Sequence, residues 1–156
     1  MINPAECPYY LNDFFTYQRV VRLKSERTIE SYYVDLRLFL RYLKVKHGVV
    51  PQDTPFKFID IADVPLEYIK SFTKLDALQY LNYVASVRGN TAKTRHRKLA
   101  SLRMFFKCLY RDLNIIDSDP TKDVDYPKMH EHLPKFLTLG ESVNLLENMN
   151  TDDPFY

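Results

Sequence analysis

The sequence predicts an all-α protein, and two observations support this prediction. Apolar residues recur at steps of three and four along several stretches, as they do on one face of an α-helix. Glycine occurs only 3 times in 156 residues, whereas phosphate-binding loops and dinucleotide folds need several glycines at fixed positions. We therefore expect a helical bundle, with no P-loop or Rossmann domain and no convincing β-strand.

The first two predicted helices lie within residues 8–47. The first runs from Pro8 to Lys24, since proline is tolerated in a first turn, where no amide donor is needed. Its apolar stripe comprises Leu11, Phe14, Phe15, Val20 and Val21. Ser25 can cap the second helix with its hydroxyl, and Gly48 can end it in a left-handed conformation. Its expected buried face comprises Ile29, Tyr32, Tyr33, Leu36, Phe39, Leu40 and Leu43.

Residues 49–72 contain three prolines and predict a long loop with short ordered turns. The third helix follows, capped by Thr73 and Asp76 and ended by Gly89. Its expected buried stripe is Leu75, Leu78, Leu81 and Val84 or Ala85.

The fourth helix begins near Asn90 or Thr91 and ends at Asn114, a residue type that tolerates the left-handed conformation. Its buried face is predicted at Leu99, Leu102, Phe106, Leu109 and Leu113. Beyond Asn114, prolines break the pattern and predict an extended linker. Thr138 and Glu141 then fit a capping box that starts one more helix. Because that helix has little left to pack on, we expect the chain to be a fragment of a longer protein.

The net charge of +2 conceals an uneven distribution. Residues 19–47 sum to +5 and residues 88–113 to +7, and these two segments contain 16 of the 22 lysines and arginines. The other three segments sum to −2, −2 and −6. Two concentrated cationic segments indicate a polyanionic partner that both approach together, although a merely solvated basic surface would give the same sums.

Both basic segments contain a helix start that suits phosphate contact. Cations crowd the first turns of the fourth helix, where the helix dipole favours acids, so an external anion explains them better than stability does. The candidates there are Asn90, Thr91, Lys93, Thr94, Arg95, Arg97 and Lys98. The start of the second helix offers a weaker set for base or phosphate contact in a major groove, namely Lys24, Ser25, Arg27, Thr28 and Ser31.

Nothing in the sequence predicts catalysis, a cofactor or a small-molecule site in this chain. Cys7 and Cys108 are too few for a disulfide framework or a four-ligand zinc site. His130 and His132 lack a third metal ligand. No apolar run of about 18 residues and no signal-peptide pattern occurs, so we expect a cytoplasmic protein without membrane insertion.

Together these motifs resemble the N-terminal core-binding domain of tyrosine recombinases, the group of Xer recombinases, phage integrases and conjugative-transposon integrases. The second helix is similar to the family pattern S-x-x-T-x-x-x-Y-x-x-D-L-x-x-F at Ser25, Thr28, Tyr32, Asp35, Leu36 and Phe39. The fourth is similar to T-x-x-R-x-L-x-x-L-R-x-F-F at Thr94, Arg97, Leu99, Leu102, Arg103, Phe105 and Phe106. Asp119 and Pro120 stand where the family usually has Asn-Pro.

The resemblance implies a four-helix SAM-like bundle at residues 1–114, a linker at residues 115–137 and the start of a truncated catalytic domain at residues 138–156. The bundle would clamp one face of a double-stranded DNA recombination half-site, with Arg103 as a further contact. The tyrosine that attacks the scissile phosphate, giving a 3′-phosphotyrosyl link, would lie in the later domain, so this chain would not itself cut DNA. The full-length protein would form a homo-oligomer on DNA in a bacterium, phage or mobile element.

Two other functions stay open at this point. A helical protein-interaction module could use the same basic faces to bind an acidic protein partner. A helix-turn-helix regulator needs a short turn between two helices, and the junction at Arg88, Gly89 and Asn90 permits one.

Overall fold

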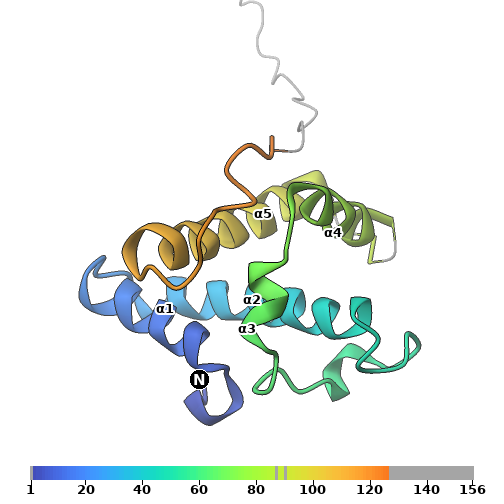
Figure 1. Cartoon of the computed structure of the whole chain (residues 1–156), viewed down its shortest axis with the longest axis horizontal. Helices are drawn as coiled ribbons and strands as arrows, with labels where there is room; N and C mark the ends of the chain where they lie inside the picture. Colours follow the sequence, from blue (N-terminus) through green and yellow to red (C-terminus); the bar gives the residue numbers. More distant parts are fainter. Residues whose placement is uncertain (1, 87, 90, 127–156) are drawn as a thin grey trace, which may run out of the picture.

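The computed structural model describes residues 2–86, 88–89 and 91–126, which fold into an all-α bundle (Figure 1). Its helices are α1 (Tyr9–Val20), α2 (Glu26–Lys46), α3 (Leu66–Lys70), α4 (Lys74–Ser86) and α5 (Ala92–Lys107), with 3₁₀ turns at Pro4–Glu6 and Phe56–Phe58 and a π-helical turn at Cys108–Asp112. The described ranges contain no strand. The predicted all-α class is confirmed, and the helix predicted within residues 138–156 lies outside the described residues.

The four long helices pack in two layers around an aromatic core. In Figure 1, α1 and α2 form the lower layer and α4 and α5 the upper one. The α5 helix contacts both α2 and α4, and the π-helical turn after it contacts α1. Phe39 of α2 packs against the rings of Phe72, Tyr80 and Phe106 at centroid distances of 5.1, 5.3 and 6.0 Å. These contacts join distant parts of the chain into one core.

The predicted helix boundaries are confirmed where a capping residue defines them. Ser25 Oγ accepts a hydrogen bond from the Thr28 amide at 3.2 Å. Thr73 and Asp76 form a reciprocal pair, in which the Asp76 amide donates to Thr73 Oγ1 at 3.1 Å and the Thr73 amide donates to Asp76 Oδ2 at 2.9 Å. Asn114 ends the turn after α5 with a φ of 53°, in the left-handed region that asparagine tolerates.

The buried face of α1 is confirmed only in its first two turns. Leu11, Phe14 and Phe15 are buried, but Val20 and Val21 are 68% and 55% exposed. Gln18 is fully buried in their place. The spacing explains this result, because residue 18 continues the steps of three and four from Leu11, whereas Val20 and Val21 leave that face.

The predicted face of α4 is wrong in its first two turns. Leu75 and Leu78 are 62% and 45% exposed, whereas Ala77 and Tyr80 are buried. Only the later part of the prediction holds, since Val84 is buried and Leu81 partly so. The tyrosine ring decides the orientation, because it fills the space beside Phe39 that a leucine on the other face would leave empty.

The long connection between α2 and α4 is ordered and packs on the bundle. Its buried side chains are Ile59, Ile61, Val64, Ile69 and Phe72. Lys44 of α2 fastens it, since its buried Nζ donates to the Asp60 carbonyl at 2.8 Å and to the Asp63 carboxylate at 2.6 Å. The hydrogen bond from Lys44 lowers the pKa of Asp63 below its ordinary value.

The described part of the predicted linker also packs against the helices. Ile116 and Val124 are buried and belong to the hydrophobic core. The sequence did not reveal this packing, because the prolines and aspartates of this stretch dominate its composition. The domain boundaries at residues 114 and 137 remain predictions.

A matched pair of substitutions tests the orientation of α4. Leu78→Ala should change the free energy of unfolding by less than about 1 kcal/mol, because nearly half of that side chain already faces water. Leu102→Ala, at a fully buried site in α5, should cost about 2–5 kcal/mol. Urea unfolding measures both, and equal losses would contradict the orientation described for α4.

Acid titration tests the Lys44–Asp63 ion pair. The lowered pKa of Asp63 in the folded state means that its contribution is full above about pH 4 and is lost as the pH falls through the folded-state value. Asp63→Asn should therefore melt below the parent chain at about pH 6, and the difference should shrink toward about pH 2.5. Thermal melts across that range measure it; a difference that does not depend on pH would contradict the role of the pair.

Candidate nucleic-acid interface

The α5 helix begins with a capping residue followed by cations, as the sequence predicts. Thr91 has an extended backbone, and its Oγ1 accepts a hydrogen bond from the Thr94 amide at 3.2 Å. The first turn contains no acidic residue, so nothing within it offsets the positive end of the helix dipole. Free amides, hydroxyls and cations at this end favour an anionic ligand. Asn90 lies outside the described residues.

The cations of the second turn converge on Asp35 of α2, whose side chain is 1% exposed. Arg97 donates through Nη2 to Oδ1 at 2.8 Å and through Nε to Oδ2 at 3.3 Å. Lys98 Nζ donates to Oδ1 at 3.1 Å, and Ser101 Oγ donates to Oδ2 at 2.7 Å. The Lys98 side chain is only 8% exposed, so this predicted contact residue lies inside the bundle.

One face of α5 has exposed cations at both ends and partly buried residues between them. Lys93, Arg97, Ala100, Met104 and Lys107 follow one another at alternating steps of four and three residues, which places them on a single face. A hollow of about 480 Å³ lies at its start, lined by Lys93, Thr94, His96, Arg97 and Ala100. Three of these five residues are of basic type, namely Lys93, His96 and Arg97, and none is acidic.

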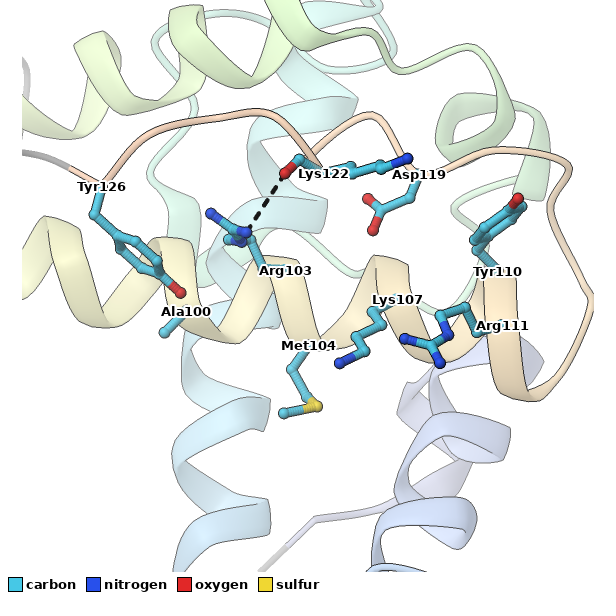
Figure 2. Close-up of a pocket in the computed structure, with 9 residues that line it drawn as sticks. All are labelled: Ala100, Arg103, Met104, Lys107, Tyr110, Arg111, Asp119, Lys122 and Tyr126. Carbon is cyan, nitrogen blue, oxygen red and sulfur yellow. Dashed lines mark hydrogen bonds between the residues drawn. The ribbon is translucent and has the colours of Figure 1, made fainter.

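A second hollow, here called the basic groove, lies between α5 and residues 117–126 (Figure 2). Its volume is about 610 Å³. The lining residues are Ala100, Arg103, Met104, Lys107, Tyr110, Arg111, Asp119, Lys122 and Tyr126. Four of them are lysine or arginine and one is acidic, so the groove has a net positive charge. Its position extends the basic face of α5 toward the π-helical turn.

Arg103 fastens the segment 117–126 beside α5. Its Nη1 donates to the Val124 carbonyl at 2.7 Å, and its guanidinium lies 4.9 Å from the centre of the Tyr126 ring. The Tyr126 ring also stacks on His96, with centroids 4.2 Å apart. The Asp119 carboxylate turns the chain by accepting hydrogen bonds from the Thr121 amide and hydroxyl. Part of the hydrogen-bonding capacity of Arg103 is therefore used within the protein.

The start of α2 lies beside the end of α5 and not beside its start, since Arg22, just before α2, pairs with Asp112 of the π-helical turn at 3.6 Å. Thr28, Ser31 and Asp35 are spaced by three and four residues and share one face of α2. Since Asp35 binds Arg97, α5 meets α2 on that face. Ser31 lies about 6 Å and Thr28 about 10 Å along the helix axis from Asp35. Arg27 lies at the edge of the face, about 80° round the helix.

Most of the predicted residues at the start of α2 are exposed. Lys24, Ser25, Arg27 and Ser31 are exposed, and Thr28 is half-buried. Glu26, the acid of the first turn, is bound by Arg19 of α1 at 2.9 Å, and this hydrogen bond lowers the pKa of Glu26. Its charge is thereby offset, and Arg27 and Lys24 remain as cations at this helix start.

The structure thus brings together Thr91, Lys93, Thr94 and Arg97, with Arg95 half-buried beside them. It adds residues that the sequence reasoning missed, namely Lys107, Arg111, Lys122 and Tyr126. The spacing of Arg103, Lys107 and Arg111 at steps of four was a usable signal, because such residues share a helix face. Lys122 and Tyr126 gave no such signal, since their positions depend on how residues 117–126 fold back.

The groups with raised pKa values lie in the core. Burial raises the pKa of Tyr10, whose hydroxyl donates to the Val64 carbonyl at 2.8 Å, and burial also raises the pKa of Tyr80. Burial raises the pKa of the Cys108 thiol to about 11. These shifts favour the protonated groups at neutral pH, so none is activated as a nucleophile.

The described part of the chain has neither a metal-ligand cluster nor a membrane-spanning helix. It contains no group of three or more His, Cys, Asp and Glu side chains that could hold a metal ion. None of its helices is both long and apolar enough to span a bilayer. His130 and His132 lie outside the described residues.

Known proteins match this chain over the helices described above. Tyrosine recombinase XerC of Caldanaerobacter subterraneus subsp. tengcongensis is 42% identical over 148 residues, which cover 95% of this chain and 41% of that protein. Tyrosine recombinase XerC of Pelotomaculum thermopropionicum is 32% identical, covering 93% of this chain and 42% of that protein. Tyrosine recombinase XerD of Halalkalibacterium halodurans is 31% identical, with the same coverage of 93% and 42%.

The chain spans about two fifths of the length of these curated relatives. No solved structure matches it significantly. The family model for the phage integrase N-terminal SAM-like domain matches residues 10–115, which run from the start of α1 past the end of α5. The chain therefore belongs to the phage integrase N-terminal SAM-like domain family.

Proposed function

We propose that this chain binds duplex DNA, as the N-terminal clamp of a site-specific tyrosine recombinase. The observation that supports this proposal most strongly is the solvent-facing side of α5, where Lys93, Arg97 and Lys107 share a face with the cations of the basic groove. Phosphate contacts supply most of the sequence-independent affinity of DNA-binding proteins, and arginine and lysine make most of them.

The dimensions of α5 suit a major groove. Lys93 and Lys107 are 14 residues apart, or about 21 Å along the helix, and a B-DNA major groove about 12 Å wide admits one α-helix. Ala100 and Met104 stand between the cations on that face. The small side chain of Ala100 would let the helix approach base edges, where it can contact thymine methyl groups, whereas Met104 packs partly against the core.

The start of α2 would contact the neighbouring backbone through Lys24, Ser25, Arg27, Thr28 and Ser31. These residues lie toward the end of α5, where Arg22 pairs with Asp112, so the two helix starts would contact the DNA backbone at separate points. Lys98 and Arg103 would support DNA binding indirectly, because both have partners within the protein. Lys98 binds the buried Asp35, and Arg103 holds the 117–126 segment.

The whole protein would cut and rejoin DNA through a tyrosine in a separate catalytic domain, giving a 3′-phosphotyrosyl intermediate. The names and lengths of the relatives support this, since this chain corresponds to about two fifths of proteins called tyrosine recombinases. It would act as a homo-oligomer on a recombination half-site in a bacterial cytoplasm and would need no cofactor.

Salt titration of DNA binding tests the electrostatic basis of this proposal. If five to seven phosphates are neutralised, log affinity should fall against log salt with a slope of roughly −5 to −6. Fluorescence anisotropy with random and inverted-repeat duplexes measures it. A flat salt response would contradict the proposal, and equal competition by polyglutamate would favour an acidic protein partner instead.

Two triple variants with the same net charge test whether the basic face of α5 binds DNA. Lys93→Gln, Lys107→Gln and Arg111→Gln together should lower DNA affinity about 30-fold or more, because three phosphate contacts are lost. The control replaces three exposed lysines outside the groove, Lys57, Lys70 and Lys74, by glutamine. It has the same net charge and should bind within about threefold of the parent. Equal losses in both variants would show that net charge alone, and not the α5 face, determines binding.

A further inference from the structure

Asp35 is a buried carboxylate that accepts more hydrogen bonds than its burial requires. Each oxygen accepts two, with Arg97 and Lys98 on Oδ1 and Arg97 and Ser101 on Oδ2. Lys98 and Ser101 are buried beside it. Those two residues alone would neutralise its charge and give each oxygen a donor. The bonds to Arg97 therefore need a further explanation.

The net positive charge of this cluster lies at the protein surface. One carboxylate faces two cations, and the buried Lys98 already balances Asp35 inside the bundle. Arg97 is 53% exposed, so the surplus positive charge is located at the surface. Arg97 keeps most of its attraction for an external anion although it is bound to Asp35, because the charge of Asp35 is already neutralised by Lys98.

The geometry fixes how Arg97 faces solvent. Its bonds to Asp35 use Nη2 and Nε, so Nη1 takes no part in them. The side chain lines the hollow at the start of α5 together with Lys93 and Thr94. An exposed arginine normally loses rotamer freedom when it binds a ligand, and a side chain already fixed by two hydrogen bonds loses less.

We propose that Asp35 is a positioning residue for DNA binding, which holds Arg97 so that its Nη1 edge is a preformed ligand for a backbone phosphate. This inference rests on the proposed function and names the residue that prepares one of its contacts. Asp35 itself touches no DNA. It acts through Arg97, and the same carboxylate fixes where α5 crosses α2.

The test removes the carboxylate without changing the net charge or leaving a buried cation. Asp35→Asn alone would strand the ammonium of Lys98 in the interior, which is strongly destabilising. The double variant Asp35→Asn, Lys98→Met replaces the buried ion pair by neutral groups of similar size, a change that proteins often tolerate. Its net charge equals that of the parent, so long-range attraction to DNA is preserved.

DNA affinity of the whole chain is measured by anisotropy, with thermal melts as the folding control. Arg97→Gln should lower affinity about tenfold, and the double variant about fivefold. Adding Arg97→Gln to the double variant should cause no loss beyond that of Arg97→Gln alone. Ser101→Ala removes a bond to the same carboxylate without touching Arg97, so it should lower the melting temperature and leave affinity within about twofold.

The possible outcomes separate the inference from the proposed function. If the parent chain does not bind DNA, the proposed function fails. If the parent binds and Arg97→Gln weakens it, but the double variant binds like the parent, only the positioning role of Asp35 is overturned. If the double variant lowers DNA affinity by the same factor in the Arg97→Gln background as in the parent, the effect belongs to Lys98. The positioning role of Asp35 is overturned in that case too.

Arg97→Lys provides a second test within an intact interior. Lysine keeps the charge but cannot bind the carboxylate at two atoms and present a third edge. We expect about the same loss as for Arg97→Gln, and parental affinity in Arg97→Lys would overturn the inference even if the double variant failed to fold.

Discussion

The contact between Asp35 of α2 and the second turn of α5 is the interaction on which the arrangement of this domain depends. A carboxylate is costly to bury, and here four hydrogen-bond donors from α5 compensate it. Because the donors come from Arg97, Lys98 and Ser101, the contact fixes both where α5 crosses α2 and how α5 is rotated. The start of α2 lies beside the π-helical turn that follows α5, where Arg22 pairs with Asp112 at 3.6 Å.

The basic residues of α5 serve three different purposes, although they are alike in the sequence. Lys98 neutralises a buried acid, and Arg103 holds residues 117–126 against the helix. Lys93 and Lys107 face solvent, where they remain available to a polyanion. A charge sum over this segment therefore overstates the cations that DNA could meet there, and burial decides how many remain.

Residues 117–126 connect the fold to the proposed interface. The segment adds Val124 to the hydrophobic core and places Lys122 and Tyr126 along the groove beside α5. A stretch whose proline and aspartate content indicates a free linker thus forms one wall of the basic groove. The stacking of Tyr126 on His96 brings the chain back over the exposed side of α5.

The sequence by itself determined the all-α class and most helix boundaries, because caps such as Ser25, Thr73 and Asn114 act through neighbouring residues. It also located both basic helix starts. The resemblance of its motifs to the N-terminal domain of tyrosine recombinases agrees with the family to which the chain belongs. Only the tertiary structure decided that Tyr80 rather than Leu78 faces the core, and that Lys98 is internal. Those outcomes depend on contacts between residues far apart in the chain, such as Asp35 and Lys98, which no local pattern encodes.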